Sequence, residues 1–375
     1  MNIGNRLKEK RGEKQLEIGI FGLPLTGKST IFSLLTNTKI EDSFKREIIK
    51  RTAQIKDNRV LSLAKLYDPK KIVFASLDFI DIPSYDHKGD PKEKNRIFQM
   101  IQTVDALLLV IRAFENPSVP WPEGANNAIR QLEILQTELI FRDLEVVENR
   151  LERLQMQKKK TKVSQLEEQE EKVLGKLKEF LEQETFLSKI ELTEEEKKVI
   201  SSLSLFTLKP IIVCINVDDE QFSNKFYEFK QEILGECKNQ NFAYIEIDGK
   251  IETEINELES EDEKKMFLEE LSIEEPGIDR LAKIVYNHVG LISFFTVGKD
   301  EVRAWTVKKG STMKEAAGKI HSDFEKNFIR AEVMKYNDLI KYGSEEKVKE
   351  NGLWRLAGKE ELVEDGEILN IRANA

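Results

Sequence analysis

The sequence predicts an α/β domain with a mostly parallel sheet, an α-helical coiled-coil hairpin that interrupts it, and a smaller α+β module after it. Three observations predict this layout. Strand-like apolar runs alternate with helical segments in the first part, a long stretch with apolar residues at steps of three and four interrupts them, and a hairpin pattern follows residue 290. The 375 residues suffice for two or three domains with buried cores.

Five apolar runs predict the strands of the α/β domain. Most are nearly continuous in apolar residues, which is typical of strands covered on both faces. They are LEIGIF (16–21), VFASLDFI (73–80), ALLLVI (106–111), PIIVCIN (210–216) and FAYIEI (242–247). We expect an N-terminal extension at 1–15, the α/β domain at 16–125 and 201–288, the helical insertion at 126–200 and the terminal module at 289–375.

The insertion contains two apolar stripes joined by KKKTK (158–162), which predicts an antiparallel helical hairpin. The first stripe is Ile140, Leu144, Val147, Leu151 and Leu154, and the second is Leu166, Val173, Leu177, Phe180 and Leu187. A third helix is expected to begin at Thr193, because Glu196 completes a capping box. Such an arm either contacts a partner or serves as a solvated spacer.

The terminal part predicts a compact α+β module. ISFFTV and EVRAWTV are strand-like and separated by GKD, which indicates a hairpin, and TMKEAAGKIHSDFEKNF is helical. Its basic residues either form a positive surface for RNA or are ordinary solvated charge. They are Arg303, Lys308, Lys309, Lys319, His321, Lys326, Arg330 and Lys335.

The composition excludes several other function classes. The formal net charge of −9 means that contact with nucleic acid needs a local basic patch. Cys214 and Cys237 have neither metal-ligand spacing nor a disulfide framework, which favours a reducing cytoplasm. The polar N-terminus, and the lack of a run of about 18 apolar residues, predict a protein that is neither secreted nor membrane-spanning.

A phosphate-binding loop follows the first strand. Residues 22–29, GLPLTGKS, satisfy G-x-x-x-x-G-K-[ST] between a strand and a helix. Gly22 and Gly27 let backbone N–H groups point at phosphate oxygens, and the helix N-terminus adds positive potential. Lys28 is expected to reach the β- and γ-phosphates, and Ser29 to bind Mg²⁺.

Two later strand ends match further parts of a nucleotide site. Asp81 ends the LDFID run at the position of the D-x-x-G motif of GTPases, but Ser84 stands at its glycine. After IIVCI, Asn216 and Asp219 match the guanine-reading pattern N-K-x-D, while Val217 replaces its lysine. An ordinary polar strand end is the alternative interpretation of this second segment.

The chain resembles the YchF or Obg-like ATPases, a family of P-loop GTPases of the translation-factor class. The resemblance runs from about residue 16 to the end and is carried by GLPLTGKST, VIRAFENP (110–117), DNRVLSLAKLYDP (57–69), EPGIDRLAKIVY (275–286) and, most strongly, FFTVGKDEVRAWTV, AAGKIHSDFEKNFIRAEVMKY and WRLAGKEELVEDGEILNIR. It implies a P-loop G domain, a TGS module with a ubiquitin-like β-grasp fold, and an ATP- or GTP-binding regulator associated with ribosomes. The helical arm and the TGS module would be the contact surfaces.

This chain departs from the family's pattern at positions expected to bind or hydrolyse the nucleotide. Leu25 stands where the family has asparagine, and Tyr85 follows Ser84 where the family carries an apolar residue. No threonine lies within EDSFKREIIKR, where the resemblance places a Mg²⁺-binding switch threonine, and Thr52 is the nearest. The family's base motif ends in Glu and tolerates adenine, whereas Asp219 favours guanine.

The motifs and the resemblance together predict a purine-nucleotide site. Lys28 is the catalytic candidate, and Ser29 and Asp81 are the expected Mg²⁺ ligands. The expected nucleotide contacts are Gly22, Leu23, Pro24, Leu25, Thr26, Gly27, Lys28, Ser29, Thr30, Asn216, Val217, Asp219, Asp248 and Gly249. The last two stand where a Ser/Cys-Ala pair meets the base in the family.

Two functions remain open at this stage. One is a slow GTPase or ATPase switch that acts at the ribosome, with GTP slightly favoured by Asp219. The other is a nucleotide-binding adaptor for the ribosome or RNA that has lost hydrolysis, for which the departures at Leu25, Ser84 and the switch segment argue. A small-molecule P-loop kinase is disfavoured because no arginine-bearing lid is recognisable.

Overall fold

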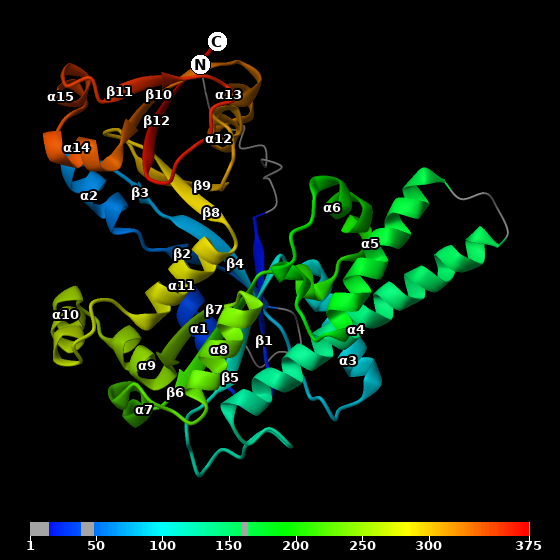
Figure 1. The fold of residues 1–375 in the computed structure, drawn as a ribbon. Coiled ribbons are helices and arrows are strands. Elements are labelled where there is room, and N and C mark those ends of the chain that lie inside the picture. Colours follow the sequence, from blue (N-terminus) through cyan, green and yellow to red (C-terminus); the bar gives the residue numbers. More distant parts are fainter. Residues whose placement is uncertain (1–14, 39–48, 160–163, 375) are drawn as a thin grey trace, which may run out of the picture.

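A six-stranded sheet forms the centre of the α/β domain in the computed structural model, which describes residues 15–38, 49–159 and 164–374 (Figure 1). In spatial order the strands are β2 (Ile49–Ile55), β4 (Ala75–Asp81), β1 (Glu17–Phe21), β5 (Ala106–Arg112), β6 (Ile211–Val217) and β7 (Ala243–Asp248). β2 is antiparallel to β4, and the other neighbouring strands are parallel. The predicted mostly parallel sheet is therefore confirmed.

Helices cover both faces of this sheet, so β5 and β6 are buried along their whole length. One face packs against α1 (Lys28–Thr36), α2 (Asn58–Tyr67) and α11 (Gly277–His288). The other face packs against α3 (Pro91–Thr103), α4 (Ala128–Lys158) and α8 (Lys230–Gln240). The remaining helices of this part are α7 (Asp219–Asn224), α9 (Gly249–Glu257) and α10 (Glu261–Glu270).

The helical arm projects from the α/β domain as α4 and α5 (Gln165–Glu182), followed by short helical segments (Figure 1). These segments are η2 (Leu187–Lys189), α6 (Glu194–Ile200), η3 (Ser201–Leu203) and η4 (Phe206–Leu208). The α4 stripe and the capping box at Thr193 are confirmed. Leu166 was wrongly placed in the α5 stripe: it lies in the first turn and is 66% exposed, whereas Leu174 and Leu181 fill the seam.

The terminal module forms a second sheet with helices on it. The strands in spatial order are β11 (Trp354–Ala357), β10 (Phe328–Lys335), β12 (Glu367–Ala373), β8 (Leu291–Thr296), β9 (Val302–Lys308) and β3 (Ile72–Val73). The helices are α12 (Met313–Ile320), α13 (Ser322–Lys326), α14 (Tyr336–Tyr342) and α15 (Glu345–Glu350). The hairpin β8–β9 and the parallel pair β8–β12 give the expected β-grasp arrangement.

Two features of the sheets differ from the sequence prediction. The predicted strand 73–80 is two strands, because β3 pairs with β9 of the second sheet while β4 pairs with β1. The chain therefore passes directly from the second sheet at β3 to the first sheet at β4. An ion pair between the Arg59 guanidinium and the Asp365 carboxylate, at 2.7 Å, also joins the two parts. The helix predicted for TMKEAAGKIHSDFEKNF (312–328) is interrupted at His321, which has an extended backbone and is the N-cap of α13.

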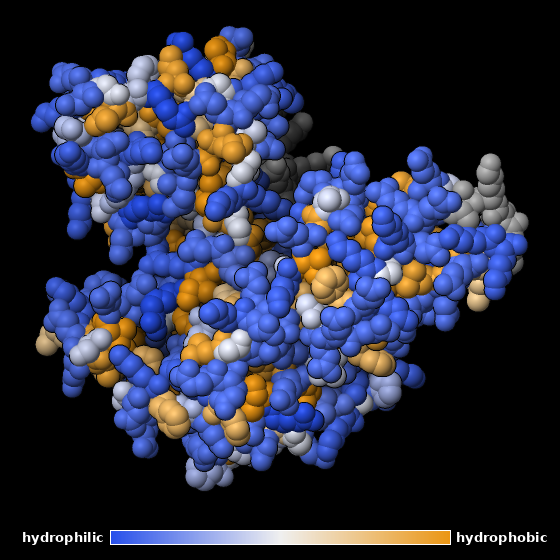
Figure 2. Space-filling view, in the orientation of Figure 1, coloured by the Kyte–Doolittle hydropathy of each residue, from blue (hydrophilic) through white to orange (hydrophobic). Residues whose placement is uncertain are grey.

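The face of the molecule shown in Figure 2 is mostly hydrophilic, with apolar residues gathered in smaller patches between hydrophilic ones. Among the residues that the structure describes, no helix has the length and apolar character needed to cross a membrane. The domain boundaries expected from the sequence remain predictions.

Candidate functional site

The loop between β1 and α1 has the backbone that phosphate binding requires. Gly27 has a φ of 91°, and a Cβ there would lie 2.2 Å from Asn216 Nδ2. A Cβ on Gly22 would lie 2.5 Å from the Val110 carbonyl oxygen. No side chain caps the N-terminus of α1, so its first N–H groups are available to an anion.

Leu25 is an unusual residue for its backbone conformation in this loop. Its φ of 61° is left-handed, and its side chain is 51% exposed. Asparagine adopts this conformation readily, whereas leucine pays roughly 1–2 kcal/mol in steric strain. The loop therefore keeps its shape with an apolar side chain at the site's mouth. Leu23 and Thr26 are buried, so they face the site with backbone only.

Lys28 is the central cation of the site and is 5% exposed. Its ammonium donates to Ser84 Oγ at 2.6 Å and to the Leu23 carbonyl oxygen at 3.5 Å. Burial lowers the pKa of Lys28 to about 8, and the nearby Asp81 carboxylate opposes that shift. A buried ammonium with only neutral oxygen partners is well suited to receive phosphate oxygens.

Ser29 and Asp81 come together next to this lysine. Ser29 Oγ lies 3.5 Å from Asp81 Oδ2, and burial raises the pKa of Asp81. Adjacent ligands of one octahedral Mg²⁺ ion lie about 3 Å apart, so these oxygens fit such an ion with a small adjustment. No group of three or more His, Cys, Asp or Glu side chains suited to a metal occurs in the described part of the chain. A Mg²⁺ ion here would rely on phosphates and water for its other ligands.

The segment after Asp81 is fixed against the phosphate loop. The N–H of Ile82 donates to the Ile20 carbonyl at 3.2 Å, and the N–H of Tyr85 donates to the Gly22 carbonyl at 3.0 Å. The Tyr85 ring is fully buried, with its centroid 5.6 Å from both the Phe21 and Phe98 centroids. Tyr85 therefore presents no polar group to an attacking water.

The predicted switch segment lies largely outside the described residues, which omit 39–48. Thr52, the nearest threonine, lies in β2 and donates its hydroxyl to Asp78 Oδ1 at 2.7 Å. It therefore does not reach Ser29 or Asp81 in this structure. A threonine ligand for Mg²⁺ is not present among the described residues of this segment.

Asn216 connects the two ends of the site. Its amide nitrogen donates to the Thr26 carbonyl oxygen at 3.1 Å, and its oxygen accepts from the Gly249 N–H at 3.2 Å. The side chain is 5% exposed. Asn216 thus braces the phosphate loop against the start of α9. The sequence had suggested this residue only as a nucleotide contact. Val217 is buried in the core and could contribute only backbone.

The end of the site that the sequence predicts to contact the base carries three charged groups. Asp219 Oδ2 accepts from the Lys250 ammonium at 2.7 Å, which lowers the pKa of Asp219. Asp248 caps α9 by accepting from the N–H groups of Lys250 and Ile251. Burial raises the pKa of Asp248 to about 6, and the proximity of Asp219 adds to the shift. Lys250 directly follows Asp248 and Gly249 in the sequence, but no local pattern pairs it with a residue 31 positions earlier.

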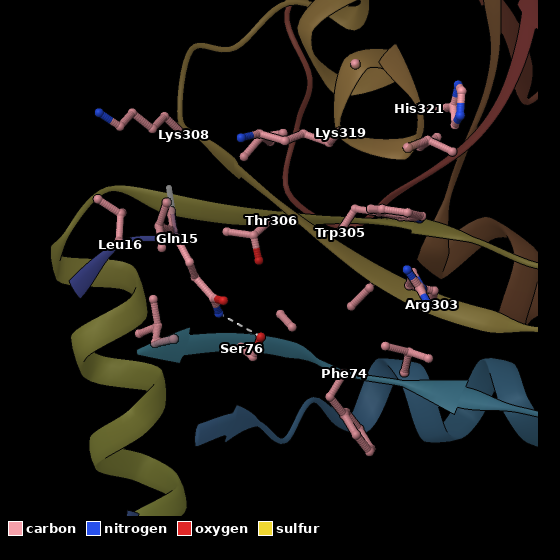
Figure 3. Close-up of a pocket in the computed structure, with 18 of the residues that line it drawn as sticks. Gln15, Leu16, Phe74, Ser76, Arg303, Trp305, Thr306, Lys308, Lys319 and His321 are labelled. Carbon is pink, nitrogen blue, oxygen red and sulfur yellow. Dashed lines mark hydrogen bonds between the residues drawn. The ribbon is translucent and has the colours of Figure 1, made fainter. Parts of the chain in front are cut away.

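The predicted basic set of the terminal module is only partly assembled. A groove of about 920 Å³ lies between β4 and β9, away from the phosphate loop (Figure 3). Four basic residues line it, namely Arg303, Lys308, Lys319 and His321. The Arg303 guanidinium lies 4.7 Å from the centroid of the Trp305 ring. Lys309, Lys326, Arg330 and Lys335 do not line this groove.

Comparisons with known proteins agree with this architecture. A family model described as "50S ribosome-binding GTPase" matches residues 17–217, and the model YchF-GTPase_C, described as a protein of unknown function, matches residues 291–374. The "Ribosome-binding ATPase YchF" of Bacillus subtilis is 40% identical over 370 residues, which cover 96% of this chain and 99% of that protein. Its counterpart in Haemophilus influenzae is 36% identical over 364 residues, covering 95% and 98%.

A solved structure extends the similarity to the fold. The Schizosaccharomyces pombe YchF GTPase superimposes with a TM-score of 0.83 at 29% identity, covering 96% of this chain and 99% of that one. Together with the family models and relatives that span nearly the whole chain, this shows that the chain belongs to the YchF family of P-loop GTPases.

Proposed function

We propose that this chain binds purine nucleoside triphosphates with Mg²⁺, hydrolyses them slowly, and acts at the ribosome. The observation that carries the proposal is the buried Lys28 ammonium, which lies within one phosphate-binding loop beside Ser29 and Asp81. The relatives are named ribosome-binding ATPases, which supports action at the ribosome and a cytoplasmic location.

Each group has a distinct part in binding. The backbone N–H groups of the loop, which only Pro24 lacks, would face the phosphate chain, and Lys28 would neutralise charge on its β- and γ-phosphates. Ser29 and Asp81 would hold Mg²⁺, which supplies further charge neutralisation at the same oxygens. Asn216 keeps the loop and the base end in register, because it bonds to both.

Hydrolysis needs more from the site than binding does. In-line attack needs a positioned water, and the buried ring of Tyr85 offers no group for that purpose. The same observation favours the second candidate function, a nucleotide-binding adaptor without hydrolysis. We expect slow but measurable turnover, because positioning and charge neutralisation alone accelerate phosphoryl transfer.

Phosphate release from purified protein at saturating GTP and ATP tests hydrolysis, with Lys28→Ala as the blank. A wild-type rate clearly above the blank supports the slow hydrolase. A rate equal to the blank, together with retained nucleotide binding, would leave the adaptor as the function.

Base preference is proposed as a small preference for guanine. Asp219 supplies the carboxylate that guanine N1 and N2 require, but its ion pair with Lys250 competes for one oxygen. A competition titration of GTP against ATP tests this preference. An ATP affinity equal to or greater than that for GTP would overturn it.

The helical arm and the terminal module are proposed as the surfaces that contact the ribosome or its RNA. The basic groove beside Trp305 supports a contribution from the module, since aromatic and basic side chains together suit single-stranded RNA (Figure 3). Co-sedimentation with ribosomes tests this proposal with and without nucleotide. Binding that changes with nucleotide and is altered by Lys28→Ala supports a switch, whereas binding that ignores both supports an adaptor.

A further inference from the structure

We infer that the Ser84 hydroxyl donates a hydrogen bond to the γ-phosphate of a bound triphosphate, so that this chain selects triphosphates over diphosphates with a side chain. The inference rests on the proposed function, because it requires nucleotide at the phosphate loop. Ser84 replaces the glycine of D-x-x-G, whose N–H meets the γ-phosphate in GTPases. The structure indicates that the serine brings a second donor to the same place.

The hydrogen-bond directions leave the Ser84 proton available. A lysine ammonium can only donate, so in the 2.6 Å contact Lys28 Nζ donates and Ser84 Oγ accepts. The hydroxyl then keeps its own proton for a different acceptor. Within the described residues Ser84 has no other side-chain hydrogen-bond partner, and its side chain is exposed at the mouth of the site.

Lys28 also fixes where that acceptor will be. The lysine of this loop motif reaches the β- and γ-phosphates, so a hydroxyl in contact with its ammonium lies beside the γ-phosphate oxygens. Ser29 and Asp81, the expected Mg²⁺ ligands, lie 3.5 Å apart, and the Asp81 carboxylate is near enough to Lys28 to raise its pKa. A diphosphate has no oxygen at this place and gains nothing from the hydroxyl.

The position of Ser84 is set before nucleotide arrives. The N–H groups of Ile82 and Tyr85, on either side of it, donate to carbonyls of β1 and the phosphate loop. The Tyr85 ring anchors the segment in a cluster with Phe21 and Phe98. A donor held in place by its neighbours loses little freedom on binding, which increases its effect on affinity.

Calorimetric titrations of wild type and Ser84→Ala test the inference with Mg²⁺ and guanosine or adenosine nucleotides. The ligands are the diphosphates and non-hydrolysable triphosphate analogues of each base. We expect Ser84→Ala to weaken triphosphate binding about tenfold or more, as for a hydrogen bond to a charged group, and to leave diphosphate binding within about twofold. Ser84→Thr keeps the hydroxyl and is expected to retain the selectivity.

Several outcomes would overturn the inference. Equal changes of diphosphate and triphosphate affinity would show that Ser84 acts only through Lys28, either by competing with phosphate for its ammonium or by holding it in place. Unchanged triphosphate affinity would remove the contact altogether. If wild type binds neither class of nucleotide, the proposed function fails and the inference with it, a result distinct from the other two. Because Ser84 is exposed, an unchanged thermal midpoint verifies that each variant is folded.

Discussion

The two ends of the nucleotide site are built differently. At the phosphate end Lys28 and Asn216 are each 5% exposed and bonded to neighbouring elements. At the base end the side chains of Asp219 and Lys250 are 54% and 68% exposed, and each has the other as its ion-pair partner. Buried polar contacts are costly to break, whereas exposed ion pairs contribute little. In the proposed site, phosphate binding would therefore be fixed by the fold, and base choice would depend on a weak surface contact.

Replacing Asn216 by alanine should have the largest effect, because it removes a buried contact that joins the two ends of the site. The change leaves the Thr26 carbonyl and the Gly249 N–H without their partner in a buried place. We expect about 10–100-fold weaker binding of GTP and ATP alike, and a loss of about 1–3 kcal/mol in the free energy of unfolding. Calorimetry and urea denaturation measure the two effects. A loss confined to one base would show that Asn216 reads the base and does not brace the loop.

Raising the pH should weaken the binding of phosphates at Lys28 and leave the base contacts unchanged. The pKa of Lys28 is lowered to about 8 in the free protein, so the lysine loses its proton as the pH rises through 8. Bound phosphates favour the charged form, so binding above pH 8 must take up a proton. We expect affinity to fall by up to about tenfold per pH unit above 8.

Lys28→Arg is the matched control for the pH series, since arginine stays charged throughout this range. Its affinity, though reduced by the altered geometry, should not change between pH 7 and 9. An equal pH dependence in both proteins would assign the effect to another group.

Replacing Lys250 by methionine should increase the preference for GTP over ATP by a small amount. The change removes the ammonium that occupies Oδ2 of Asp219 and so makes this oxygen available to guanine. Exposed ion pairs contribute up to about 1 kcal/mol, so we expect the ratio of GTP to ATP affinity to rise by about two- to fivefold. Lys250→Arg keeps the pair and should keep the ratio. A ratio that falls in the methionine variant would contradict this account of Asp219.

The sequence predicted the phosphate end better than the base end, and the reason is physical. Gly22, Gly27, Lys28 and Ser29 lie within eight residues, so local spacing determines their geometry. The contact of Asn216 with Thr26 and the pair of Asp219 with Lys250 join residues far apart in the chain, and no local pattern encodes them.

The same distinction applies to the fold. The apolar runs of β5 and β6 were recognised because both of their faces are buried. β2 was missed because it is an edge strand with mostly exposed residues, IKRTAQI, which show no clear alternation. β3 has two residues, too few for any period, and only the second sheet defines it as a strand.

Titration of Mg·GTP and Mg·ATP into wild type and Lys28→Ala tests the central claim most directly, namely that nucleotide is held through its phosphates at Lys28. Circular dichroism should first verify that the variant is folded. The account predicts saturable one-to-one binding of both nucleotides by wild type and at least a hundredfold weaker binding by Lys28→Ala, as expected for removal of a buried charged partner. Wild type without saturable binding, or a folded Lys28→Ala that binds as tightly as wild type, would contradict it.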